Sequence, residues 1–295
     1  MNDYVLSCCS TADLSAGYLL RRDIPYLGYP YFIDGKKYRD DFGQSLNHAI
    51  FYSMMRAGAD TKTTQLNADE YEAYFTPFLE KGKDVLHVTL SSGLSGSYNS
   101  AMIAREKLSR LYPEQKLIIV DSLSASAGNG LLVDKLADLR DEGMKITDLG
   151  NWAEQHKQHL QHWFFSSDLT FYIKGGRISK TQGFIGTTMK ICPLLDVNNQ
   201  GRLVPRAKIR GKKKTIREIV KRMSEHANNH LAYDERCFVS HSDCLEDAEA
   251  VANLVMETFP RLKGKVKIFP IGTTIGSHTG PGTVALFFWG DARVE

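Results

Sequence analysis

The chain has 295 residues, of which 42% are hydrophobic and 24% charged, a composition typical of a globular protein and not of a disordered one. Its 37 basic and 34 acidic residues leave a net charge of +3, which is too small to indicate a nucleic-acid-binding surface. No run approaches the roughly 18 apolar residues of a membrane-spanning helix, and no basic segment precedes an apolar one at the N-terminus, so we expect neither stable membrane insertion nor a signal peptide.

The first half of the chain alternates predicted strands with predicted helices. Strands are expected at 4–9, 84–90 and 116–122, and helices at 44–58, 67–82, about 98–112, in a segment ending near 142, and at 146–161. Asn67, followed by Glu70 three residues later, gives the capping-box pattern of a helix start. Two prolines and a D-G-K-K turn indicate a small β excursion near 24–41. This alternation predicts a parallel, Rossmann-like α/β domain over residues 1–165.

The second half has a different pattern. Strands are expected at 162–169, 201–211, 236–242 and 265–272, and helices at 180–191, 214–229 and 245–259. This order favours a C-terminal α+β domain over residues 166–295, with a mixed or antiparallel sheet. The sequence therefore predicts an α/β protein of two domains.

The cysteines argue for a reducing environment. They are odd in number and show no C-x-x-C spacing, and they occupy the positions Cys8, Cys9, Cys192, Cys237 and Cys244. Neither a disulfide framework nor a zinc ribbon fits this arrangement, so we expect a cytoplasmic protein.

The stretch "SSGLSGSYNSA" at 91–101 lies between a predicted strand and a predicted helix. It lacks the lysine of a phosphate-binding G-x-x-x-x-G-K-[ST] loop, and around Ser95 the closing glycine of G-x-S-x-G comes one position early. A shifted nucleophile turn, with Ser95, Asp121 and His278 in that chain order, stays open. Backbone N–H groups at a helix start, together with serine hydroxyls, also form a site for an anion. Helix capping by the serines and a tight turn at the glycines would explain the same residues without a ligand.

Three further stretches have the character of ligand-binding loops. "DSLSASAGNG" at 121–130 ends a neighbouring strand in the same Ser/Gly-rich style. Arg177 follows two glycines and offers a guanidinium suited to a carboxylate or phosphate. His278 lies between glycine-rich turns, where a side chain can be aimed at a cleft.

The other histidines are weaker candidates for chemistry. The spacing of His156, His159 and His162 is typical of the solvated face of a helix. His226 and His230 have the i, i+4 spacing of metal ligands, but no third ligand lies near them in sequence. We therefore expect no metal site.

Taken in order, six stretches resemble the DegV family, whose members include the FakB-type fatty-acid-binding proteins. These are "STADL", "TTQL", "SSGLSGSYNSA", "DSLSASAGNG", "YIKGGRIS" and "IGSHTGPGTVA". The resemblance covers essentially the whole chain. It implies two domains that hold one long-chain fatty acid between them, with no other cofactor.

The resemblance also implies where the carboxylate of that fatty acid binds. The serine of the family's L-S-G turn falls on Ser95, and the threonine of its T-S-Q-P-S loop falls on Thr63, with Ser92 and Thr64 close by. The arginine of G-G-R-I falls on Arg177, and the histidine of S/T-H-x-G-P-G falls on His278. These last two positions are implied to lie near the head group and to help present it to a partner kinase.

Two motifs depart from the family pattern. Residues 9–11 read C-S-T in place of D-S-T, so a carboxylate is missing at the head of the first strand. Residues 63–67 read T-T-Q-L-N in place of T-S-Q-P-S, so a hydroxyl is kept at Thr64 and the rigid proline is lost. Thr63 and Thr64 both stay open as the head-group ligand.

Our interpretation is a non-catalytic protein that binds a long-chain fatty acid. It would offer the carboxylate to a separate ATP-dependent fatty acid kinase, which forms an acyl phosphate for phospholipid synthesis. The apolar stretches at 163–173, 183–195 and 284–289 are candidates for the tunnel wall or for ordinary core. A serine hydrolase using Ser95 and His278, and a binder of another small anionic metabolite, are the alternatives.

Overall fold

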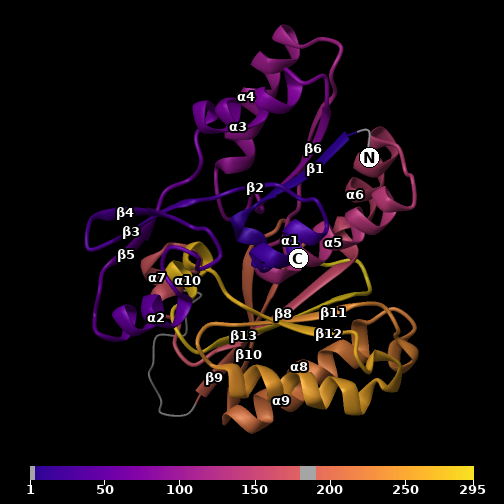
Figure 1. Ribbon diagram of the computed structural model, residues 1–295. Helices are drawn as coiled ribbons and strands as arrows, with labels where there is room; N and C mark the ends of the chain where they lie inside the picture. The colour runs from indigo at the N-terminus through magenta and orange to yellow at the C-terminus, as the bar shows by residue number, and fades with distance from the viewer. Residues whose placement is uncertain (1–3, 180–190) are drawn as a thin grey trace.

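The computed structural model describes residues 4–179 and 191–295, and Figure 1 shows two main layers of sheet with helices around them. The fold is mixed α/β, as the sequence predicts, with one parallel and one mixed sheet. The helix expected at 180–191 lies outside the described residues, apart from Ile191, which begins a strand. The same gap contains most of the apolar stretch at 183–195.

The first sheet is parallel throughout. Its strands, in spatial order, are β2 (Tyr26–Leu27), β1 (Tyr4–Cys9), β6 (Asp84–Thr89) and β7 (Leu117–Asp121). Helices cover both of its faces, which explains why its strands read as continuous apolar runs. One face packs against α3 (Ala68–Leu79) and α4 (Ser97–Leu111), and the other against α5 (Ser126–Asp141) and α6 (Ile146–His156). Helix α3 starts after Asn67 with the predicted capping box.

The second sheet is antiparallel except for one parallel pair, β11 with β12. Its order is β10 (Leu203–Arg210), β9 (Ile191–Val197), β8 (Leu160–Ser166), β13 (Thr283–Trp289), β11 (Cys237–His241) and β12 (Val266–Pro270). Helices α8 (Lys212–His226) and α9 (Leu245–Thr258) cover the face drawn lowest in Figure 1. Helix α5 packs on the opposite face, so it lies between the two sheets. The domain division at 165 stays a prediction, and β8 already belongs to the second sheet.

A third, small sheet lies beside the junction of the two large ones (Figure 1). It is antiparallel and consists of β4 (Lys36–Arg39), β3 (Pro30–Ile33) and β5 (Thr61–Thr63). The remaining helices are α1 (Ala16–Arg21), α2 (His48–Arg56), α7 (Thr170–Lys174) and α10 (Thr273–Thr279), with 3-10 turns at Ser10–Ala12, Lys157–His159, His230–Ala232 and Pro260–Leu262. Helix α10 contacts β3 and β5, so a C-terminal segment lies against an N-terminal sheet.

The structure corrects three local predictions. Helix α6 ends at His156 and not at 161, and β8 begins at Leu160, so His162 is in a strand and is buried. His278 lies on helix α10 and not in a glycine-rich turn. The apolar segment near 284–289 is β13, a central strand that the sequence prediction missed because both of its faces are buried and its residues do not alternate.

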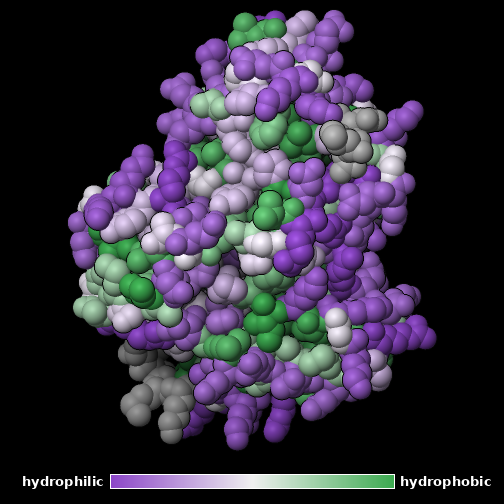
Figure 2. Space-filling model, viewed as in Figure 1, coloured by the Kyte–Doolittle hydropathy of each residue, from purple (hydrophilic) through white to green (hydrophobic). Residues whose placement is uncertain are grey.

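Outside the core, the face of the molecule seen in Figure 2 is mostly hydrophilic, with hydrophobic residues in small groups. None of the helices in the described parts of the chain combines the length and the apolar character needed to cross a bilayer.

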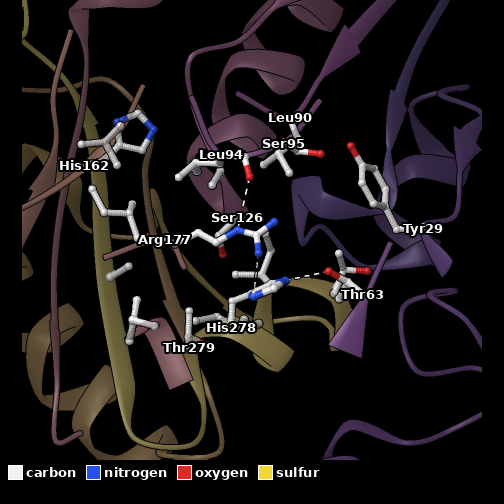
Figure 3. Close-up of a pocket in the computed structure, with 18 of the residues that line it drawn as sticks. Tyr29, Thr63, Leu90, Leu94, Ser95, Ser126, His162, Arg177, His278 and Thr279 are labelled. Carbon is white, nitrogen blue, oxygen red and sulfur yellow. Dashed lines mark hydrogen bonds between the residues drawn. The ribbon is translucent and has the colours of Figure 1, made fainter. Parts of the chain in front are cut away.

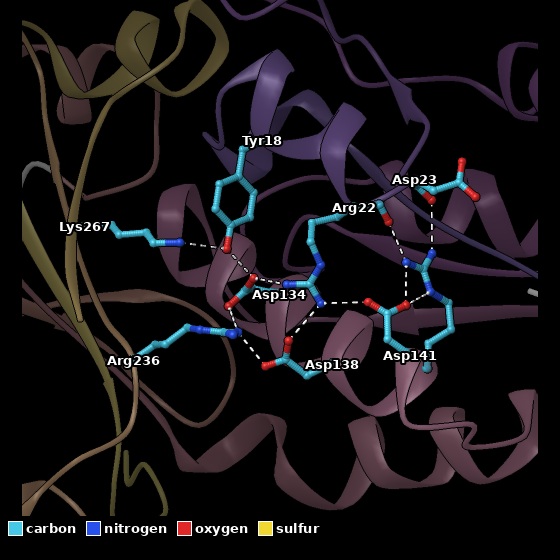
Figure 4. Close-up of polar contacts among 9 residues, drawn as sticks. Tyr18, Arg22, Asp23, Asp134, Asp138, Asp141, Arg236 and Lys267 are labelled. Carbon is cyan, nitrogen blue, oxygen red and sulfur yellow. Dashed lines mark hydrogen bonds and ion pairs between the residues drawn. The ribbon is translucent and has the colours of Figure 1, made fainter. Parts of the chain in front are cut away.

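Ion pairs on α5 join the two large layers (Figure 4). The buried carboxylate of Asp134 accepts hydrogen bonds from Arg22, at the end of α1, at 2.9 Å and from Arg236, just before β11, at 2.5 Å. The hydroxyl of Tyr18 also donates to Asp134, and Asp138 pairs with both arginines. A buried carboxylate of this kind is stabilised only while its cationic partners stay in place. The network therefore fixes α1, α5 and the second sheet relative to one another.

Candidate functional site

A cavity of about 390 Å³ lies between the parallel sheet, the small sheet and the second sheet. The loops after β6 and β7 contribute Leu90, Leu94 and Ala125 to its lining, and the second sheet contributes a wall of side chains. Ligands of open α/β sheets bind at these carboxyl ends of the parallel strands. The volume is in the range of small-molecule sites in proteins.

The four hydroxyl side chains predicted for a carboxylate all line this cavity. They are not equally enclosed: Thr63 and Ser95 are half-buried, whereas Thr64 and Ser92 are exposed. Thr63 ends β5 of the small sheet, and Ser95 lies two residues before the start of α4. The sequence positions are 32 residues apart, and both side chains line one cavity. The N–H of Leu66, three residues after Thr63, donates to Ser97 Oγ in the first turn of α4 and joins the two segments.

The imidazole of His278 links Thr63 to Arg177, as Figure 3 shows. His278 Nε2 lies 2.6 Å from Thr63 Oγ1, and His278 Nδ1 lies 3.4 Å from Arg177 Nη1. Because a guanidinium only donates, Nδ1 accepts and the ring proton lies on Nε2. Nε2 then donates to Thr63 Oγ1, which leaves the proton of the Thr63 hydroxyl free to donate to a ligand.

The charge of this group of residues comes from Arg177 alone. Burial, and then the neighbouring Arg177, lower the pKa of His278 to about 3, so the imidazole is neutral at pH 7. Burial also lowers the pKa of the Arg177 guanidinium, which nevertheless stays protonated. The partners that the structure gives Arg177 are all neutral: the carbonyls of Leu94 and Gly175, and His278. A half-buried cation with neutral partners, beside free hydroxyl donors, favours an anion.

The serine-rich loop divides its hydroxyls between support and cavity. Ser91 Oγ donates to the carbonyl of Gly201, in the turn between β9 and β10, at 2.8 Å. Ser97 Oγ accepts from the backbone N–H of Leu66 at 3.1 Å. Ser95 Oγ accepts from the N–H of Ser97 at 3.3 Å and lies 3.1 Å from Ser97 Oγ. When Ser97 is the donor between the two hydroxyls, the proton of Ser95 is available to another acceptor. Ser91 and Ser97 thus hold the loop, and Ser95 faces the cavity at the start of α4, where the helix dipole favours negative charge.

Helix α10, which carries His278, is held at its N-terminus by two carboxylates from the first part of the chain. Asp13 Oδ1 accepts from the N–H of Gly272 at 3.0 Å, and Asp40 Oδ2 accepts from the N–H of Thr274 at 3.1 Å. Both carboxylates are buried. The "STADL" motif therefore acts on the site indirectly, because its aspartate orients the helix of the last motif.

The hydrolase alternative finds no support in the geometry. His278 is bonded to Thr63 and Arg177, and not to Ser95. Asp121 Oδ1 accepts from the backbone N–H groups of Ser92 and Leu123. The three residues Ser95, His278 and Asp121 are therefore not connected as the nucleophile, general base and orienting carboxylate of a triad require.

The second sheet forms the deep wall of the cavity. Alternate residues of β13 line it, namely Thr283, Ala285 and Phe287, and β8 adds His162 and Phe164. A strand presents every second side chain to one face, so these residues share one surface. His162, expected on a solvated helix, is instead 1% exposed, with Nε2 2.5 Å from Ser124 Oγ.

Comparison with known proteins gives the family. The family model described as "uncharacterised protein, DegV family" matches residues 9–291. A DegV domain-containing protein of Clostridium perfringens is 37% identical over 293 residues, which cover 99% of both chains. This chain belongs to the DegV family. The family resemblance seen in the sequence motifs is thereby confirmed.

A more distant relative and a solved structure bear names that refer to lipids. A protein of Thermotoga maritima named fatty acid-binding protein is 28% identical over 279 residues, covering 93% of each chain. The crystal structure of a DegV lipid-binding protein, also from Thermotoga maritima, superposes with a TM-score of 0.86 at 26% identity and covers 99% of both chains. The DegV fold is thus shared over the full length of the chain.

Several residues that line the cavity were not singled out by the sequence analysis. Tyr29, Ser126 and Gln65 also line the cavity, together with His162. Tyr29 lies in the predicted β excursion, and nothing in its sequence neighbourhood marks it as functional. Within residues 4–179 and 191–295, no three His, Cys, Asp or Glu side chains are grouped so that they could hold a metal ion.

Proposed function

We propose that this protein binds one long-chain fatty acid, with the carboxylate at Thr63 and Ser95 and the tail along the second sheet. The observation that carries the proposal is the cavity itself. At one end, hydroxyl donors lie beside Arg177, whose hydrogen-bond partners are neutral, and next to them is a wall that includes Phe164 and Phe287. The names of the Thermotoga maritima relatives support the same ligand class. Thr64 and Ser92, which are more exposed, would contribute at the rim.

The energetics of such a ligand fit this division of the cavity. At about 0.8 kcal/mol for each buried methylene, a palmitoyl tail offers on the order of 10 kcal/mol before the costs of association. Hydrogen bonds from two or three hydroxyls roughly offset the desolvation of the carboxylate. The tail would set the affinity, and the hydroxyls would set the orientation.

The proposal extends to the use of the bound lipid. The chain carries no G-x-x-x-x-G-K-[ST] loop, so we assign the phosphoryl transfer to a separate ATP-dependent fatty acid kinase. Arg177 and His278, next to Thr63, would present the carboxylate to that kinase, and the protein would carry the acyl phosphate towards phospholipid synthesis. The five free cysteines agree with a cytoplasmic location.

The first experiment is mass spectrometry of an organic extract of the protein, purified without added lipid. We expect about one fatty acid per chain. The second is the double variant Thr63→Ala with Ser95→Ala, assayed for fatty-acid affinity after delipidation, with Thr61→Ala on the same strand as the control. Weakened binding in the double variant alone supports the head-group site. An empty extract, with no exchange of added fatty acid, would contradict the ligand class, and unchanged affinity in the double variant would contradict the head-group assignment.

The role of Arg177 in presentation is tested separately. Arg177→Ala should still bind fatty acid, because the tail provides most of the affinity, but it should be phosphorylated more slowly by the kinase. Arg177→Lys, which keeps the charge but not the planar fork, is the matched variant. A normal rate of acyl phosphate formation with Arg177→Ala would remove this role.

A further inference from the structure

Tyr29 is one of three side chains lining the cavity, with His162 and Thr274, that carry a buried polar atom without a hydrogen-bond partner in the described part of the chain. It is 2% exposed, its side chain lines the cavity, and its buried hydroxyl oxygen has no hydrogen-bond partner among the residues that the structure describes. A buried hydroxyl without a partner is costly, and phenylalanine would fill the same space without that cost. The hydroxyl would therefore be stabilised by a hydrogen-bond acceptor that the described residues do not provide.

The surroundings of Tyr29 point its hydroxyl towards the head-group end. Figure 3 shows the hydroxyl directed towards Ser95. Burial raises the pKa of Tyr29 well above its ordinary value. The phenol thus stays protonated and can act as a donor at every physiological pH.

The neighbouring hydroxyls already have partners of their own. Ser97 Oγ receives the N–H of Leu66 and lies 3.1 Å from Ser95 Oγ. The hydroxyl of Tyr71 lies 3.6 Å from the sulfur of Cys9. None of these oxygens is within hydrogen-bonding geometry of the Tyr29 oxygen, so the proton of Tyr29 is left for an acceptor that enters the cavity.

The backbone around Tyr29 is fixed, so the direction of its side chain is set before any ligand arrives. Its N–H donates to Ser10 Oγ at 3.0 Å, and its carbonyl accepts from the N–H of Asp40 at 2.8 Å. A donor held in this way loses little conformational freedom when a ligand binds.

We infer that the Tyr29 hydroxyl donates a hydrogen bond to the carboxylate of the bound fatty acid, beside Thr63 and Ser95, and so makes the site specific for an ionised head group. The inference rests on the proposed function. It adds to that function a donor that no sequence motif marks.

The test compares two ligands with the same tail, palmitate and hexadecanol, on the delipidated protein. A hydrogen bond to a charged group is strong enough that Tyr29→Phe should bind palmitate roughly tenfold or more weakly, while hexadecanol affinity changes by no more than about twofold. Tyr172→Phe is the control, because Tyr172 lines the same cavity but its hydroxyl is bonded to Thr283 Oγ1 at 2.9 Å. It should leave the ratio of the two affinities unchanged.

Two outcomes would overturn the inference. One is a Tyr29→Phe variant that binds palmitate as tightly as the wild type or loses affinity for both ligands by the same factor. The other is a lower melting temperature of the ligand-free variant, because removing an unpartnered buried hydroxyl should keep or raise it. If the wild type itself binds neither ligand, the proposed function fails, and this inference with it; failure in the variant alone concerns only Tyr29.

Discussion

The deep wall of the cavity gives a prediction about the length of the ligand. Ala285 lies on β13, across from Phe164 of β8 and Ser240 of β11, and its side chain is directed into the cavity with 5% exposure. Substitution of Ala285 by Phe would put a phenyl ring into a space of about 390 Å³. We expect this ring to occupy the place of part of the tail without touching the head-group site.

The magnitude follows from the methylenes that the ring displaces. If it excludes about four of them, at about 0.8 kcal/mol each, a long-chain fatty acid loses roughly 3 kcal/mol, or about 200-fold in affinity. A short-chain acid that never reaches β13 loses nothing. The variant should therefore shorten the chain length at which affinity stops increasing.

The assay is a series of dissociation constants for saturated acids from octanoate to stearate, measured on delipidated protein. Ala285→Ser, which changes polarity with little change in volume, is the control and should keep the wild-type optimum. An unchanged optimum in Ala285→Phe, with unchanged affinities and a normal melting temperature, would refute a tail that runs along β13. An equal loss for short and long acids would place Ala285 near the head group instead.

Three further predictions concern the support of the site. Burial lowers the folded-state pKa of His87 to about 3, below the unfolded value of about 6.5, so the unfolded chain binds more protons between these values and stability falls as the pH drops through this window. Urea denaturation should show about 2.5 kcal/mol of this loss between pH 7 and pH 4.5, and a His87→Asn variant with the same pH dependence would contradict it. Asp40→Ala should lower the free energy of unfolding by about 1 kcal/mol and weaken fatty-acid binding, because the N–H of Thr274 at the start of α10 loses its acceptor. An unchanged melting temperature with unchanged binding would contradict the role of Asp40 in holding the N-terminus of α10. Leu66→Pro should destabilise the protein by about 1 kcal/mol despite the rigidity of proline, since it removes the donor to Ser97 Oγ, and a higher melting temperature would show that rigidity is the larger effect.

The fold was predictable where local pattern and burial agree. The strands β1, β6 and β7 were expected within a residue or two, because each is a short apolar run bounded by polar turns. The pattern failed at the junction of α6 and β8, where the three-residue spacing of His156, His159 and His162 continues across a helix end. Spacing alone does not reveal where the backbone changes from one period to the other.

The cavity was predictable only in part. The motifs brought attention to Thr63, Ser95, Arg177 and His278, and the structure gathers all four around one cavity; their contact with a ligand stays a prediction. The place of Tyr29 in the cavity could not be predicted, because the interest of this residue depends on what surrounds its hydroxyl in space and not on its neighbours in sequence. The same holds for the carboxylates that cap α10, since they act on backbone N–H groups more than 200 residues away.

The two departures from the family motifs can be explained by what the new residues contact. The sulfur of Cys9 lies 3.3 Å from His87 Nε2 and 3.6 Å from the hydroxyl of Tyr71, under helix α3 and away from the cavity. Burial raises the pKa of the Cys9 thiol to about 12, so it stays neutral in this interior. Leu66, in place of proline, supplies the N–H that Ser97 accepts, which fixes the Thr63 loop to the start of α4 by a hydrogen bond where the family pattern relies on a rigid ring. The second change alters how the Thr63 loop is held, and neither change removes a side chain that lines the cavity.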